Sequence, residues 1–127
     1  MTRSERAAQI WPLLTICASH RQILSYDLLS KLIGVPRPGL GQLLEPIQSY
    51  CIIKGLPALT CLVVGENSGL PGEGFVAASD VPSEQAAVFA FDWLSHPVPA
   101  VDQLETAVQQ LPSNGRALKD LLKQIAN

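Results

Sequence analysis

The side chains that most often carry catalysis are scarce in this sequence. Its two histidines, His20 and His96, are each expected near the end of a helix, where a histidine is a common surface residue. Glu66 and Glu73 flank a predicted turn, and they are expected to be solvated charges rather than a buried acid–base pair. Nucleophilic catalysis needs a nucleophile with a base in reach, and we find no such pair. The sequence therefore predicts no catalytic residue. A small hydrolase that uses Glu73 is the least favoured of three hypotheses for the function.

The cysteine content predicts reduced, buried thiols. The three cysteines, Cys17, Cys51 and Cys61, are odd in number, and each lies among apolar residues. No CxxC motif and no histidine–cysteine pair has the spacing of a metal site. Such cysteines are typical of a protein in the reducing cytoplasm. We therefore expect a cytoplasmic protein with no metal ion and no cofactor.

Composition and charge limit the class of protein. The chain has 127 residues, of which 47% are hydrophobic and 16% charged, and these values exclude an intrinsically disordered chain. The formal net charge of -2 excludes a nucleic-acid binder held by bulk positive charge. No apolar stretch approaches the roughly 20 residues that span a bilayer, and the N-terminal apolar run is interrupted by Gln9, Pro12 and Thr15. We expect neither a signal peptide nor a membrane partner.

Helix signals cover most of the first half of the chain. A helix is predicted over residues 4–19, with Ser4 as its N-cap and a kink or a restart at Pro12. A second helix is predicted over residues 26–33, where Ser25 is the N-cap and a glycine follows the last turn.

A third helix is predicted to begin near Pro38 or Gly39. Pro46 either bends this helix or, as we favour, starts a separate short helix that reaches residue 54. The third helix would be the recognition helix of a DNA-binding domain. Its polar residues are expected on a solvated face: Gln42, Glu45, Gln48 and Ser49.

The second half of the chain begins with a strand signal. Residues 59–64 form an apolar, β-branched run that predicts a strand, and a turn at 66–69 leads to an irregular return strand or wing at 70–75. The segment GLPGEGF (69–75) has no phosphate-loop pattern, so its glycines indicate tight turns and a fixed backbone path.

Three further helices are predicted over residues 82–95, 101–111 and 115–125, the first capped by Asp80. Helices followed by a hairpin are typical of a winged-helix domain. The predicted fold class is mainly α (α+β), a winged-helix-like domain (residues 1–96) with a small β-hairpin and a C-terminal helical extension (residues 97–127). We expect the extension either to dock on the aromatic helix over 82–95 or to form a homodimer, so the protein is a monomer or a dimer.

Four segments carry a resemblance to a known family: SYDLLSKLIG (25–34), PGLGQLL (38–44), LTCLVV (59–64) and SGLPGEGF (68–75). In this order and spacing, residues 22–95 resemble the DNA-binding domain of alkylguanine-DNA alkyltransferases and of their non-enzymatic relatives, the alkyltransferase-like proteins. The resemblance implies a winged-helix fold and DNA as the partner. It also implies that Tyr26 presses on the DNA backbone near a flipped nucleotide, and that Gly41 is the glycine of the recognition-helix motif.

Departures from the family pattern bear on activity. The family's alkyl-acceptor cysteine falls at Thr60, and Cys61 stands where the family has a histidine. The arginine that enters the duplex falls at Pro38, one position after Arg37. Because the cysteine–histidine pair that activates the thiolate is missing, we expect no alkyl transfer.

We therefore expect a non-enzymatic, DNA-binding winged-helix protein. The candidate nucleic-acid-binding residues are Tyr26, Lys31, Arg37, Gly41 and Gln42. The candidate wing or pocket residues are Thr60, Cys61, Gly72, Glu73 and Gly74. The alternative is a protein-interaction module, such as an immunity, antitoxin or adaptor protein, that has lost DNA binding. A positive surface around Arg37 and Lys31 would favour DNA, and a neutral apolar surface would favour a protein partner.

Overall fold

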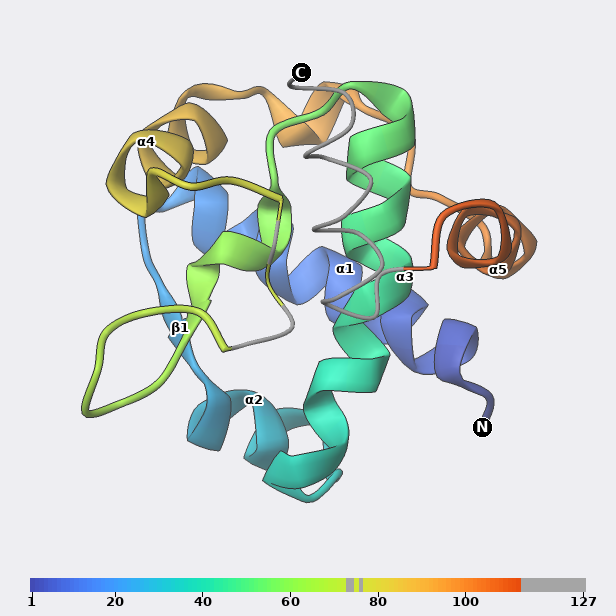
Figure 1. Ribbon diagram of the computed structural model, residues 1–127, viewed down its shortest axis with the longest axis horizontal. Helices are drawn as coiled ribbons and strands as arrows, with labels where there is room; N and C mark the ends of the chain where they lie inside the picture. The colour runs from blue at the N-terminus through green and yellow to red at the C-terminus, as the bar shows by residue number, and fades with distance from the viewer. Residues whose placement is uncertain (73–74, 76, 113–127) are drawn as a thin grey trace.

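The described part of the chain is mainly helical. The computed structural model describes residues 1–72, 75 and 77–112. In chain order, its elements are α1 (Arg3–Ser19), β1 (Leu24–Ser25), α2 (Tyr26–Ile33), the 3-10 turn η1 (Arg37–Gly39), α3 (Leu40–Lys54), η2 (Leu59–Leu62), β2 (Val63–Val64), α4 (Val81–Ala90), η3 (Trp93–Ser95) and α5 (Val101–Gln110) (Figure 1). The prediction of a mainly helical protein with a small β element is confirmed. None of the helices in this described part is long and apolar enough to cross a membrane.

The N-cap of the first helix lies two residues before the predicted one. Thr2 is the N-cap: its hydroxyl accepts a hydrogen bond from the Glu5 N–H at 3.1 Å, and the Glu5 carboxylate accepts one from the Thr2 N–H at 3.0 Å. This reciprocal pair is a capping box, and it satisfies amide groups that the first turn leaves free. The predicted N-cap, Ser4, is instead buried inside the first turn, and the helix runs through Pro12 as a single element.

The next two helices confirm one local prediction and correct another. Ser25 caps α2 by accepting the Leu28 N–H at 3.0 Å, and Gly34, with φ of 71°, ends it. By contrast, α3 is one 15-residue helix that contains Pro46, so the predicted restart there is wrong. A proline inside a helix removes one hydrogen bond, but here the turn that carries Pro46 and Ile47 is buried, and this packing favours the unbroken helix.

The predicted strand over residues 59–64 is mostly a 3-10 turn. Only Val63 and Val64 are extended, and they pair in parallel with Leu24 and Ser25 of β1. The predicted β-hairpin is wrong for the described residues, since none of the residues 65–72 and 75 belongs to a return strand. A short, continuous apolar run fits a buried turn as well as a buried strand, so its composition did not distinguish the two.

The core forms around Trp11 of α1, which is 1% exposed. Its ring lies 5.5 Å from the Tyr50 ring of α3 and 5.8 Å from the Trp93 ring, both in edge-on arrangements. The predicted helix over 82–95 ends at Ala90, because the chain is extended at Phe91 before it turns through η3. This turn lets the Trp93 indole N–H donate to the Val88 carbonyl at 2.8 Å while the ring enters the core.

The last described helix, α5, packs mainly against α3 and α1 rather than against the aromatic helix α4 (Figure 1). Its Leu104 and Ala107 belong to the same buried cluster as Trp11. The Ser49 hydroxyl also donates to the Leu111 carbonyl at 2.6 Å, which holds the end of α5 to α3. The helix predicted over residues 115–125 lies outside the described residues, and the predicted boundary after residue 96 stays a prediction.

We predict that Leu104→Ala destabilises the protein by about 2–5 kcal/mol, because Leu104 is fully buried between α5 and its neighbours. Urea unfolding followed by tryptophan fluorescence measures the change, and Gln109→Ala on the exposed side of α5 is the matched control. A loss below about 1 kcal/mol would contradict the packing of α5 on this core.

Candidate functional site

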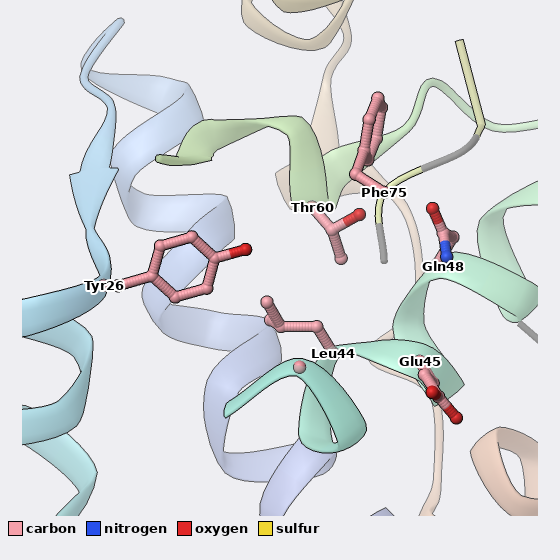
Figure 2. A pocket seen from close by; sticks show the side chains of 7 residues that line it. Tyr26, Leu44, Glu45, Gln48, Thr60 and Phe75 are labelled. Atoms are coloured by element: carbon pink, nitrogen blue, oxygen red, sulfur yellow. The ribbon is translucent and has the colours of Figure 1, made fainter. Parts of the chain in front are cut away.

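A small pocket of about 40 Å³ lies between α2, α3 and the segment that follows β2 (Figure 2). It has room for a few water molecules and is well below the volume of ordinary small-molecule sites. The lining residues are Tyr26 from α2, Gly41, Leu44, Glu45 and Gln48 from α3, Thr60 from η2, and Phe75. Segments that are distant in sequence therefore meet at one concave surface, and this surface is the candidate site.

Tyr26 connects α2 to the glycine-rich segment. It is the first residue of α2, directly after the Ser25 cap, so the cap sets where its side chain leaves the helix. Its hydroxyl oxygen accepts a hydrogen bond from the Gly72 N–H at 3.0 Å. A Cβ atom at Gly72 would lie 2.6 Å from that oxygen, so the close approach requires glycine. The structure thus places the predicted residues Tyr26 and Gly72 in direct contact.

Arg37 lies beside Tyr26 at the rim of the site. Its guanidinium carbon is 5.8 Å from the centre of the Tyr26 ring, and one guanidinium nitrogen is 3.2 Å from an Asp27 carboxylate oxygen. Exposed ion pairs of this kind contribute little to stability. Asp27 nevertheless offsets the charge of Arg37, and this weakens the positive surface that would favour DNA.

The other predicted nucleic-acid-binding residues differ in position. Gly41 lines the pocket, and Gln42 is exposed on the first turn of α3 next to it. Lys31 is exposed in the last turn of α2 and does not line the pocket. Two leucines one turn apart on the same helix, Leu28 and Leu32, are 48% and 53% exposed. The surface of α2 is therefore partly apolar.

Thr60 and Cys61 are adjacent in sequence but differ in access to the pocket. Thr60 lines the pocket, and its side chain contacts no hydrogen-bond partner among the described residues. Cys61 does not line it and is fully buried. Burial, the largest cause, raises the pKa of the Cys61 thiol to about 12, and this opposes formation of the thiolate that attack on an alkyl group needs. The predicted residues Glu73 and Gly74 lie outside the described residues.

Four lining residues were not among the predicted site residues: Leu44, Glu45, Gln48 and Phe75. The predicted solvated face of α3 is wrong for Gln48 and Ser49, which are 4% and 0% exposed, because η2 and α5 cover that side of the helix. Phe75 follows the GLPGEG segment, and the fixed backbone path predicted there was the only signal for a side chain at this place.

Glu45 carries the charge of the pocket wall. A carboxylate oxygen lies 3.4 Å from a guanidinium nitrogen of Arg3, which also approaches Glu105 at 3.6 Å. Burial raises the pKa of the Glu45 carboxyl, and the attraction of Arg3 lowers it by less. The net effect is a raised pKa, so the desolvation of the carboxylate outweighs its ion pair.

Other chemistry finds no support in the described residues. They contain no group of three or more histidine, cysteine, aspartate or glutamate side chains able to hold a metal ion. No family model, no curated protein and no solved structure matches the chain.

We predict that Glu45→Gln raises the melting temperature at neutral pH, because it removes a carboxylate whose burial is unfavourable. A raised pKa means that the folded state binds the proton more tightly than the unfolded state. The stability of the original protein, relative to the variant, should therefore fall as the pH rises from below 4.5 through the raised pKa of Glu45. Thermal unfolding between pH 4 and 8 tests this, with the exposed Glu66→Gln as control. Destabilisation by Glu45→Gln at neutral pH would show that the Arg3 pair dominates.

We also predict that a thiol reagent at pH 8 labels Cys17 first, since its side chain is only partly buried. Cys51 and Cys61 should react only when the protein unfolds, because burial raises the pKa of each to about 12. The rapid phase should disappear in Cys17→Ala and persist in Cys61→Ala. Rapid labelling of Cys61 in the folded protein would contradict its assignment as an inert core residue.

Proposed function

We propose that this protein is a non-enzymatic DNA-binding protein that contacts the duplex through the start of α2, η1, the first turn of α3 and the segment after β2. The observation that carries the proposal is a convergence at the pocket. Tyr26, Gly41 and Thr60 are three of the positions that the resemblance to alkyltransferases and alkyltransferase-like proteins singles out. They come from three different elements, and all three line the same pocket. Core packing alone does not require this coincidence.

The rim of the pocket carries groups that suit a duplex. Arg37 has a guanidinium group within reach of a phosphate, and Gln42 on the exposed first turn of α3 has an amide that can pair with adenine in a major groove. The Tyr26 ring below Arg37 offers a flat surface next to them. These groups are few, so binding in this proposal depends on shape and a small number of contacts rather than on bulk charge.

The same site supports the non-enzymatic part of the proposal. Thr60 occupies the position of the acceptor cysteine, and a threonine hydroxyl is a much weaker nucleophile than a thiolate. The neighbouring thiol of Cys61 is buried, with its pKa raised to about 12. Neither side chain is an activated nucleophile.

A second candidate function is a protein-interaction module. It is favoured by Leu28 and Leu32, which form an exposed apolar stripe on α2, and by the Asp27–Arg37 pair, which leaves the neighbouring surface close to neutral. A partner with an apolar ridge would fit that stripe. Leu28→Ser should abolish binding to such a partner and leave DNA binding unchanged.

We predict low-micromolar or weaker binding to a DNA duplex, with a shallow salt dependence. Two or three phosphate contacts give a slope of about -2 to -3 in a plot of log K against log salt concentration, and Arg37→Ala should make that slope about one unit shallower. Fluorescence anisotropy with a labelled duplex between 50 and 200 mM salt, a range of roughly a factor of four, measures both values.

The matched control is Lys54→Ala, which makes the same charge change at the opposite end of α3, roughly 20 Å away. It should leave the salt slope unchanged. The proposal fails if neither single- nor double-stranded DNA binds at the lowest salt, or if Lys54→Ala and Arg37→Ala have the same effect.

A further inference from the structure

A second pocket lies at the other end of α3, between the last turns of this helix and α5. Its volume is about 260 Å³, close to the lower limit of about 300 Å³ for ordinary small-molecule sites, so it has room for a molecule of the size of an amino acid. Figure 1 shows α5 alongside α3, and the two helices are in extensive contact. The pocket is roughly 15 Å along α3 from the first turn of that helix, so it is separate from the proposed DNA surface.

The base of this second pocket is apolar and is held by its neighbours. Tyr50 and Ala107 line it and are 5% and 3% exposed, and Ile53 adds a partly exposed aliphatic side chain. The Tyr50 ring is in edge-on contact with Trp11, and its hydroxyl oxygen lies 3.0 Å from the His96 Nε2, within hydrogen-bond distance. A fixed apolar surface of this kind suits a small aliphatic group.

Opposite charges line the two walls of the pocket. Lys54 is the last residue of α3, and Asp102 is in the first turn of α5. No ion pair joins these two side chains, and neither forms one with any other residue in the described part of the chain. The dipole of each helix accounts for the sign of its charge. It does not account for two opposite charges that line one pocket and stay too far apart for direct contact.

The polar groups of the pocket are already oriented by bonds within the protein. The Gln103 N–H donates to Asp102 Oδ1 at 3.0 Å, which leaves the other carboxylate oxygen available to a ligand. The Gln103 side-chain oxygen accepts the Ala100 N–H at 2.8 Å, so its NH2 group is the part that can donate to a ligand. The Lys54 ammonium lies 6.0 Å from the centre of the Tyr50 ring, at the edge of the apolar base. Binding to groups that are already held loses less conformational entropy.

We propose that this pocket binds a free α-amino acid with an aliphatic side chain, whose carboxylate pairs with Lys54 and whose ammonium group pairs with Asp102. A ligand with a single charge would be attracted by one wall and repelled by the other. A zwitterion satisfies both charges, and its aliphatic side chain buries apolar surface against Tyr50 and Ile53. The inference does not rest on the proposed function, and it adds a small-molecule site at a different place on α3.

The test uses three compounds that share one side chain and differ in charge. Leucine has both charges, N-acetylleucine lacks the cation, and leucinamide lacks the anion. Each is titrated into the full chain at about pH 6.5, where the amine of leucinamide is charged, and amide chemical shifts are followed by NMR. Leucine should shift the amides of Tyr50, Lys54 and Gln103 with a Kd of roughly 1 mM. It should bind about three- to fivefold more tightly than either other compound, since each of those lacks one ion pair.

Two variants assign the charges separately. Lys54→Met keeps an unbranched side chain beside Tyr50, and it should weaken leucine by about three- to fivefold without weakening leucinamide, which has no carboxylate. Asp102→Asn keeps an oxygen that can accept the Gln103 N–H, and it should weaken leucine to the same extent without weakening N-acetylleucine. If Asp102→Asn does not fold, Asp102→Ser replaces it. A loss of structure would weaken all three compounds together, so it would not produce this pattern.

Lys31→Met and Asp92→Asn are the matched controls, because they make the same charge changes at exposed positions that do not line this pocket. They should leave the affinity for leucine unchanged. The inference is overturned if leucine shifts no amide of the pocket, or if the three compounds bind equally well. It is also overturned if the control variants weaken leucine as much as Lys54→Met and Asp102→Asn do.

Discussion

The structure depends on the burial of one side chain, the indole of Trp11. It lies where α1 crosses α3, and its ring contacts Tyr50 on one helix and Trp93 on the 3-10 turn after α4. Aromatic rings in edge-on contact add to the stabilisation from buried area and hold the crossing in one geometry. Because α5 packs on α1 and α3, its position follows from the same crossing. The face of α3 that lines the pocket is oriented by this core.

A second contact shapes the site without adding much to the core. The Tyr26 hydroxyl accepts a hydrogen bond from the Gly72 N–H at 3.0 Å, and a Cβ atom at Gly72 would lie only 2.6 Å from that oxygen. The glycine-rich segment is thereby brought over the start of α3, with Phe75 at the edge of the pocket. The Phe75 N–H also donates to the Gly72 carbonyl at 3.0 Å, and the Phe75 side chain packs against the core. The tyrosine that the resemblance assigns to DNA therefore also has a structural role.

Charge is the feature that most constrains the function. The net charge is -2, and the two basic residues beside the pocket, Arg3 and Arg37, are paired with Glu45 and Asp27. Electrostatic attraction to phosphates provides most of the affinity of ordinary DNA-binding proteins. In the proposed function, DNA binding would therefore depend on a small number of contacts around Tyr26 rather than on surface charge. The exposed leucines of α2 have no assigned role in the DNA-binding proposal.

Local signals in the sequence predicted several of the helix boundaries that local hydrogen bonds determine, although the capping box of Thr2 and Glu5 was missed. Ser25 and Asp80 cap their helices and Gly34 ends one, because each acts on backbone groups within a few residues of itself. Tyr26, Gly41 and Thr60 were identified as site residues through the resemblance. The tertiary structure alone decided that α3 continues through Pro46 and that residues 59–62 form a turn. It alone placed Leu44, Glu45, Gln48 and Phe75 at the pocket. Each of these depends on burial by segments distant in the chain, and such burial changes the free energy of a residue without leaving a mark in its neighbouring sequence.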